Sequence, residues 1–187
     1  MHTLTAWGPL VAALAVILVS SSSCCCFGIR RTGDSTLERN FARNEPRFDR
    51  LVADFNSDAG LGMVDDGGVR CGGTLFDSTP ADLSALAQRG FTADRLAYYR
   101  RQLKMLGVER ILRGDGDTVE LPVDESSFLS NGIYKGYWHS TSPPVGHEKA
   151  NLDRYQPSKE DLGRFGGYLL YKPIKPNWYL YLYIDGH

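Results

Sequence analysis

The chain has 187 residues, the size of one ordinary domain with a short appendage. Its 21 Lys and Arg residues nearly balance 22 Asp and Glu residues, which excludes the basic surplus of a typical nucleic-acid-binding protein and the excess charge of an acidic tail. The hydrophobic share of 42% and the aromatic share of 11% are enough to build a core.

The first 29 residues contain no Lys, Arg, Asp or Glu, and a dense apolar run occupies residues 10–19. A run of this length suits the hydrophobic region of a signal peptide and is shorter than the roughly 20 residues that a membrane-spanning helix needs. Small residues follow at 20–23, and Cys24 comes directly after them. We therefore predict a signal peptide over residues 1–23.

An apolar run, small residues and then a cysteine resemble the signal of bacterial lipoproteins, in which that cysteine carries the lipid. The resemblance implies lipid attachment at Cys24, a cysteine cluster and tether over residues 24–35, and an anchor in the cell envelope that faces the periplasm or the outside. Cys25 and Cys26 are alternative attachment sites. A membrane anchor formed by residues 4–29 and a cleaved soluble form are the other two possibilities.

Helix signals dominate the next part of the chain. A capping box at residues 35–38 predicts a helix start, Pro46 interrupts the pattern, and an apolar stripe resumes over residues 48–55. Two further helices are predicted, from Thr79-Pro80 to Gly90 and from Thr92 to Gly107.

From residue 108 onward, apolar residues recur at every second position, which is typical of strands. An earlier pair of strands is predicted at the glycine-rich connection that begins at residue 56. Hairpins are predicted between residues 61–64 and 69–75, 108–112 and 118–123, 127–130 and 133–140 around Asn131-Gly132, and 168–172 and 178–184. Helices followed by a meander of strands indicate one α+β domain over residues 36–187, with the N-terminal helices packed on one face of an antiparallel C-terminal sheet.

The last predicted strand places Tyr179, Tyr181 and Tyr183 on one face. Tyrosines on a sheet suit the binding of a sugar or a peptide, although they also suit the solvated face of any sheet. A second aromatic group lies on a neighbouring predicted strand. Together they form our candidate binding surface, which consists of Tyr137, Trp138, His139, Tyr179, Tyr181 and Tyr183.

No catalytic or cofactor-binding motif occurs in the chain, and we predict neither a cofactor nor a metal. His139 and His147 lack the fixed spacing of metal ligands. Cys71 and His139 could form a nucleophile pair, but no signature surrounds the cysteine. Cys71 could instead pair with Cys25 or Cys26 in a disulfide, or be a buried free thiol.

The acidic turn at residues 114–120 looks like the start of a calcium-binding loop. An EF-hand loop that begins at Asp115 would need an oxygen ligand at position 119 and glycine at position 120. The chain has Val119 and Glu120 there, so we predict an ordinary hairpin turn.

Residues 98–108, 135–144 and 177–181 resemble small, uncharacterised bacterial lipoproteins. The resemblance is carried by a Lys-Gly-Tyr strand that runs into Ser-x-x-Pro-Pro, by Leu152-Asp153, and by a closing Trp-Tyr-Leu-Tyr strand. It implies a location in the cell envelope and no particular activity.

The sequence as a whole predicts an envelope-anchored binding or structural module, without enzyme activity. Its partners would be the membrane, through the lipid, and an envelope protein or glycan, but no nucleic acid. One alternative is an inhibitor- or immunity-type lipoprotein that protects the envelope and plugs a hydrolase cleft with its Pro143-Pro144 loop. Another is a hydrolase that uses His139, His147 or Cys71.

Overall fold

The computed structural model of the protein describes residues 31–77, 79–128, 131–155 and 167–185. The helices within these residues are α1 (Asp34–Ser57), α2 (Pro80–Gln88) and α3 (Ala93–Leu106). The strands are β1 (Leu61–Asp65), β2 (Gly68–Cys71), β3 (Thr74–Asp77), β4 (Arg110–Arg113), β5 (Val119–Phe128), β6 (Asn131–His139), β7 (His147–Glu148), β8 (Tyr168–Lys175) and β9 (Trp178–Ile184).

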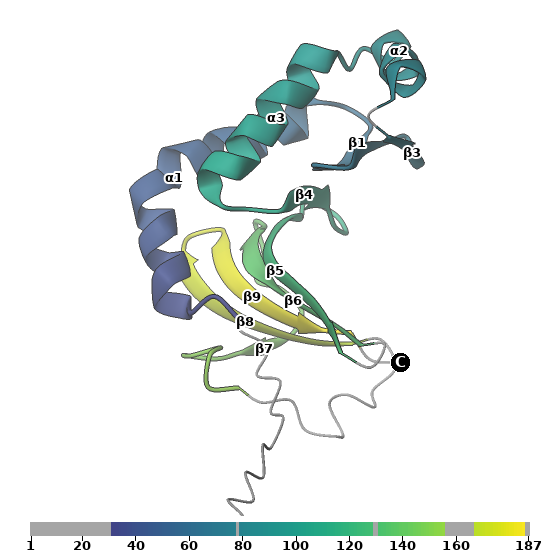
Figure 1. Cartoon of the computed structure of the whole chain (residues 1–187). Helices are drawn as coiled ribbons and strands as arrows, with labels where there is room; N and C mark the ends of the chain where they lie inside the picture. Colours follow the sequence, from purple (N-terminus) through teal and green to yellow (C-terminus); the bar gives the residue numbers. More distant parts are fainter. Residues whose placement is uncertain (1–30, 78, 129–130, 156–166, 186–187) are drawn as a thin grey trace, which may run out of the picture.

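The nine strands of the described residues form one sheet in the order β3-β2-β1-β4-β5-β6-β9-β8-β7. All neighbouring pairs are antiparallel except β7 and β8, which are parallel. Figure 1 shows α1 and α3 on one side of the curved sheet, while α2 lies beside β3. The predicted α+β class, with helices against one face of an antiparallel sheet, is confirmed.

The ends of α2 and α3 lie where their capping residues predict them. The hydroxyl of Thr79 accepts from the N–H of Asp82, and that of Thr92 accepts from the N–H of Arg95. Gly107 ends α3 in the left-handed conformation, with φ of 64°. These signals are local, which is why the sequence alone identifies them.

Helix α1 runs through Pro46 without a break, contrary to the predicted interruption. Buried side chains continue on both sides, from Leu37 and Phe41 before the proline to Phe48 and Phe55 after it. An internal proline costs about 3 kcal/mol, whereas burying each phenylalanine contributes about 1.5–3 kcal/mol. The buried stripe therefore outweighs the proline, and Figure 1 shows the helix bending between its two halves.

Strand β5 joins two stretches that the sequence predicts as separate strands, residues 118–123 and 127–130. A register shift between Pro122 and Asp124 keeps β5 paired with β6 beyond the proline, which cannot donate a backbone hydrogen bond. The two predicted strands are therefore one bulged strand.

The Asn131-Gly132 pair lies inside β6 and is not the centre of the predicted turn, because Phe128 already pairs with Asn131. A Cβ atom at position 132 would clash with the ring of Tyr134. Any other residue here would have to displace the ring of Tyr134, so the close approach of that ring favours glycine. The Asn-Gly signal correctly indicated the hairpin but placed its turn two residues too late.

The aromatic rings of α1 pack directly on the sheet. The ring centroid of Phe48 lies 4.6 Å from that of Tyr137 and 5.7 Å from that of Trp178. Farther along α1, a polar contact holds α3, because the fully buried Tyr99 donates its hydroxyl hydrogen to the Asp58 carboxylate at 2.6 Å. Helix α1 therefore packs against both the sheet and α3, and α3 in turn contacts β1.

No helix of the described residues is long and apolar enough to cross a membrane. The predicted signal peptide, and with it Cys24, Cys25 and Cys26, lies outside those residues.

Candidate functional site

The six residues of the predicted binding surface lie on two opposite faces of the sheet. Tyr137 and His139 point toward α1, on the face that also carries Trp178. The Tyr137 hydroxyl donates to the carbonyl oxygen of Leu37 at 3.0 Å, and burial raises the pKa of this phenol to about 12. The imidazole of His139 lies 4.8 Å from the Trp178 ring, and burial lowers its pKa. Both residues belong to the packing between α1 and the sheet.

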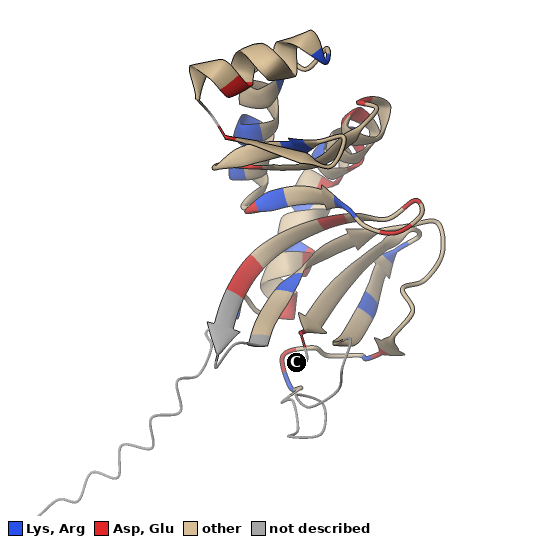
Figure 2. Cartoon of the chain, turned by 90° about the vertical axis from the view of Figure 1, so that its right-hand side faces the viewer, with Lys and Arg blue, Asp and Glu red and all other residues tan. Residues whose placement is uncertain are grey.

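The other four predicted residues, Trp138, Tyr179, Tyr181 and Tyr183, lie together on the opposite face. The antiparallel register places Tyr134 beside them. We call this side of β5, β6, β9 and β8 the tyrosine face. Figure 2 looks onto it, and no helix lies in front of these strands.

The tyrosine face is not the flat, solvated platform that alternation alone suggests. Tyr181 is only 1% exposed and Tyr179 only 8%. Their rings are covered by neighbouring rings: Trp138 lies 5.9 Å from Tyr181, and Tyr171 lies 5.7 Å from Tyr179. The aromatic side chains bury one another, so the polar atoms among them have limited access to water.

Glu120 lies beside this aromatic group, directly across from Trp138 in the β5–β6 register. Its carboxylate makes no hydrogen bond or ion pair with the side chain or backbone of any other residue that the structure describes. The nearby guanidinium of Arg110 pairs instead with Glu125 at 2.7 Å. Burial raises the pKa of Glu120, a shift that Arg110 opposes. Glu120 is thus a half-buried carboxylate without a close partner among the described residues.

Two further polar atoms of the tyrosine face are buried and unpaired within the described residues. They are the hydroxyl of Tyr181 and the indole Nε1 of Trp138. Each buried polar group without a hydrogen bond costs about 1–3 kcal/mol. Such groups are uncommon in folded proteins and call for an explanation. A bound molecule that offers a donor and an acceptor would satisfy them together with Glu120.

Two adjoining hollows open on this face and share Glu120. The larger encloses about 590 Å³, and its lining includes Asp115, Asp117, Glu120, Trp138, Pro144 and Leu169. The smaller encloses about 250 Å³, and its lining includes Arg110, Leu112, Glu120, Pro122, Tyr181 and Asp185. The volume of the larger hollow is sufficient for a side chain of a partner or for a sugar ring.

The loop after β6 forms one wall of the larger hollow, and hydrogen bonds to Asp117 in the β4–β5 turn hold the start of this loop. The carboxylate of Asp117 accepts hydrogen bonds from the N–H and the hydroxyl of Thr141, and these bonds lower the pKa of Asp117. Farther along the same loop, Pro144 is buried, whereas Val145 is 98% exposed. The apolar side chain of Val145 is therefore exposed to solvent at the rim of the hollow.

The residues of the hydrolase alternative are not brought together. Cys71 on β2 is buried with a free thiol, whereas His139 on β6 faces α1, and four strand spacings, about 19 Å, separate the two strands within the sheet. His147 is exposed at the β7 edge, stacked on Tyr168. Within the described residues no group of His, Cys, Asp and Glu side chains is arranged to hold a metal ion.

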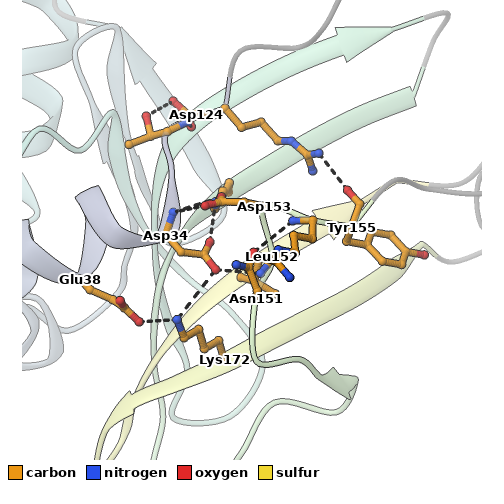
Figure 3. Close-up of polar contacts among 12 residues, drawn as sticks. Asp34, Glu38, Asp124, Asn151, Leu152, Asp153, Tyr155 and Lys172 are labelled. Carbon is orange, nitrogen blue, oxygen red and sulfur yellow. Dashed lines mark hydrogen bonds and ion pairs between the residues drawn. The ribbon is translucent and has the colours of Figure 1, made fainter.

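A second polar cluster lies on the helix side, at the start of α1 (Figure 3). The side chain of Lys135 is 1% exposed, and its Nζ lies 2.7 Å from Oδ1 of Asp34 and 2.5 Å from Oδ1 of Asp153. Asp34 also accepts a hydrogen bond from the N–H of Leu152 at 2.7 Å. The buried lysine therefore joins β6, α1 and the loop before residue 155.

Asp153 also replaces the predicted cap of α1. Its carboxylate accepts from the backbone N–H of Asp34 at 2.8 Å, whereas Gly33 holds the N-cap position with no side-chain cap. The predicted box at residues 35–38 is not formed as a cap, and Glu38 pairs instead with Lys172 at 2.5 Å. A carboxylate from a distant loop fits because a helix N-terminus favours negative charge.

The residues just before α1 are attached to the sheet as well. Thr32 donates its hydroxyl and its N–H to Asp124, and Arg31 donates to the carbonyl oxygen of Tyr155 at 3.1 Å (Figure 3). The part of the predicted tether from Arg31 onward is therefore part of the folded domain.

The Lys-Gly-Tyr element has a separate physical reason at each position. Lys135 supplies the buried cation, and Tyr137 supplies the core ring with its hydroxyl bonded to α1. A Cβ atom at Gly136 would collide with the backbone at Leu121 and Pro122 of β5. Each residue of the short motif therefore makes a structural contact of β6, which is consistent with a role in the architecture of the sheet.

Sequence reasoning missed Glu120 and the Lys135 cluster. The alternation of Val119, Glu120 and Leu121 shows that the carboxylate faces away from the core, but only the strand register places it opposite Trp138. The signal for Lys135 was its position at the centre of an alternating apolar strand, where a charge needs a partner.

The acid stability of the fold tests the Lys135 cluster. Burial alone would raise the pKa of Asp153, but hydrogen bonds from Lys135 and from the backbone of Asp34 lower it overall. A folded-state pKa below the unfolded value stabilises the fold above the unfolded pKa, and this stabilisation is lost as pH falls through the folded pKa. Urea unfolding between about pH 5 and pH 2 should therefore show a smaller loss of stability in Asp153→Asn than in the wild type.

The exposed turn residue Asp66 provides the matched control for that experiment. Asp66→Asn should keep the pH dependence of the wild type. A pH dependence of Asp153→Asn equal to that of the wild type would contradict the cluster.

Comparison with known proteins gives no independent indication of function: no protein-family model, no curated protein and no solved structure matches the chain.

Proposed function

We propose that the protein is a binding module of the cell envelope, anchored through its N-terminal cysteine cluster, that holds a ligand or partner in the hollows of the tyrosine face. The observation that carries the proposal is that the buried Nε1 of Trp138 and hydroxyl of Tyr181 have no partner among the described residues and lie beside the half-buried Glu120. A bound molecule compensates the cost of keeping them unpaired.

A second candidate, an inhibitor- or immunity-type protein, is favoured by one specific observation. Val145 is 98% exposed at the tip of a loop that Asp117 braces through Thr141. A rigid loop with an exposed apolar tip suits insertion into the cleft of a hydrolase. The binding module and the inhibitor-type protein would both contact their partner around the larger hollow. In the first the partner enters the hollow, whereas in the second the loop at Val145 enters the partner.

The anchor is tested by metabolic labelling with palmitate. Labelling should be lost in Cys24→Ser, because the sulfur of that cysteine is the predicted acceptor. Cys26→Ser is the control and should keep the label. Continued labelling of Cys24→Ser would contradict attachment at Cys24.

The binding surface is tested by a photo-crosslinking residue placed at Val145, with the same residue at Met105 as the control. Both side chains are exposed, at 98% and 42%, but Met105 belongs to α3 and lies outside the lining of both hollows. Irradiation of intact cells should give adducts from position 145 only.

A second variant decides whether the hollow or the loop binds. Combining the crosslinker at Val145 with Trp138→Ala should abolish the adducts if the partner occupies the hollow. Adducts that persist in this variant would favour the loop-insertion candidate, and equal adducts from positions 145 and 105 would contradict both.

A further inference from the structure

The charges of the larger hollow indicate what it can accept. Its lining contains the carboxylates of Asp115, Asp117 and Glu120 and no Lys or Arg. The guanidinium of Arg110 lies on the side of the smaller hollow and is held by Glu125. An anionic ligand would be repelled here, whereas a cation would be attracted.

The three carboxylates are not equivalent. Asp117 already accepts hydrogen bonds from the loop, through Ser140 and Thr141. Glu120 has no such partner among the described residues and is half-buried. A positively charged group that reached Glu120 would gain a charge-assisted hydrogen bond with little competition from within the protein.

The indole of Trp138 adds a second requirement. Its buried Nε1 carries a hydrogen that no described residue accepts, and an indole can only donate. A ligand that offered an acceptor close to its cation would complement this hydrogen as well, and the carboxylates make an anionic acceptor unfavourable. A main-chain carbonyl oxygen next to a basic side chain meets both requirements.

The rest of the lining suits the stem of such a side chain. Pro143, Pro144 and Leu169 provide apolar walls for methylene groups. The Trp138 ring itself provides an aromatic face for a cation, and guanidinium groups favour this contact because they are planar and weakly hydrated.

We propose that the larger hollow binds an arginine or lysine side chain presented by an extended peptide segment of a partner protein. Glu120 is the counter-ion of the side chain, and Trp138 donates its indole hydrogen to a main-chain carbonyl oxygen of the segment. This inference rests on the proposed function and specifies its partner. A neutral glycan, which would also satisfy donors and acceptors, does not account for the three carboxylates.

The experiment is calorimetric titration of the full chain in detergent micelles with three probes. The first is a blocked Gly-Arg-Gly tripeptide, the second replaces its arginine by citrulline, and the third is an N-acetylglucosamine trimer. Citrulline keeps the shape of arginine but removes the charge. The arginine peptide should bind with a Kd on the order of 1 mM, and the citrulline peptide at least about 10-fold more weakly.

Two variants assign the contacts. Glu120→Gln keeps the side-chain size and should weaken binding of the arginine peptide by about 10-fold. The matched control is Glu109→Gln, which changes an exposed glutamate outside both hollows and should leave the affinity unchanged. Trp138→Phe keeps an aromatic ring without the N–H and should weaken both peptides by the same factor.

The outcomes separate this inference from the proposed function. Equal binding of the arginine and citrulline peptides, unchanged binding in Glu120→Gln, or no binding of the arginine peptide up to about 10 mM would overturn the inference. Binding of the glucosamine trimer alone, with loss in Trp138→Phe, would overturn it while supporting the binding module. Failure of all three probes together with absent crosslinks at Val145 would overturn both.

Discussion

The ion pair between Lys135 and Asp34 holds the two layers of this protein in one relative position. A lysine that is 1% exposed in the middle of a sheet has no access to bulk water, so its charge must be balanced by fixed neighbours. The partners come from the first residue of α1 and from Asp153 in a distant loop. Removing the lysine would leave the buried carboxylate of Asp34 without its close ion-pair partner, at a cost of about 3–5 kcal/mol. Sliding α1 along the sheet by one turn would do the same.

This constraint explains why one face of the sheet is closed and the other open. With the start of α1 held at Lys135, Phe41 and Phe48 reach Tyr137 and Trp178, and the helix side is filled. The described residues supply no second layer of helices for the tyrosine face (Figure 2). The aromatic rings there cover one another, and two polar atoms among them, Nε1 of Trp138 and the hydroxyl of Tyr181, have no hydrogen-bond partner within the described residues.

The parts of the fold that the sequence predicts are those with local causes. The caps at Thr79 and Thr92 and the left-handed Gly107 each depend on residues within a few positions. The start of α1 was predicted to within one residue, but its cap was not, because the capping carboxylate belongs to Asp153, 119 positions away from Asp34. The continuity of α1 through Pro46 was missed for a related reason, since burial against the sheet outweighs the local cost of the proline.

The candidate site was predicted in part for the same reason. Alternation along β9 placed Tyr179, Tyr181 and Tyr183 on one face, whereas grouping Tyr137 and His139 with them ignored the alternation along β6. Glu120 could be found only from the pairing of β5 with β6.

The most direct test of the account is the NMR signal of the tryptophan indole groups in nitrogen-15-labelled protein. Trp178 donates its Nε1 hydrogen to Asp49 at 2.9 Å, whereas Trp138 has no acceptor within the described residues, so Trp178 is an internal control. Addition of the arginine peptide should shift the Trp138 indole resonance downfield as it gains an acceptor and leave that of Trp178 in place. An unchanged Trp138 resonance at saturating peptide, or equal shifts of both signals, would contradict binding at the tyrosine face.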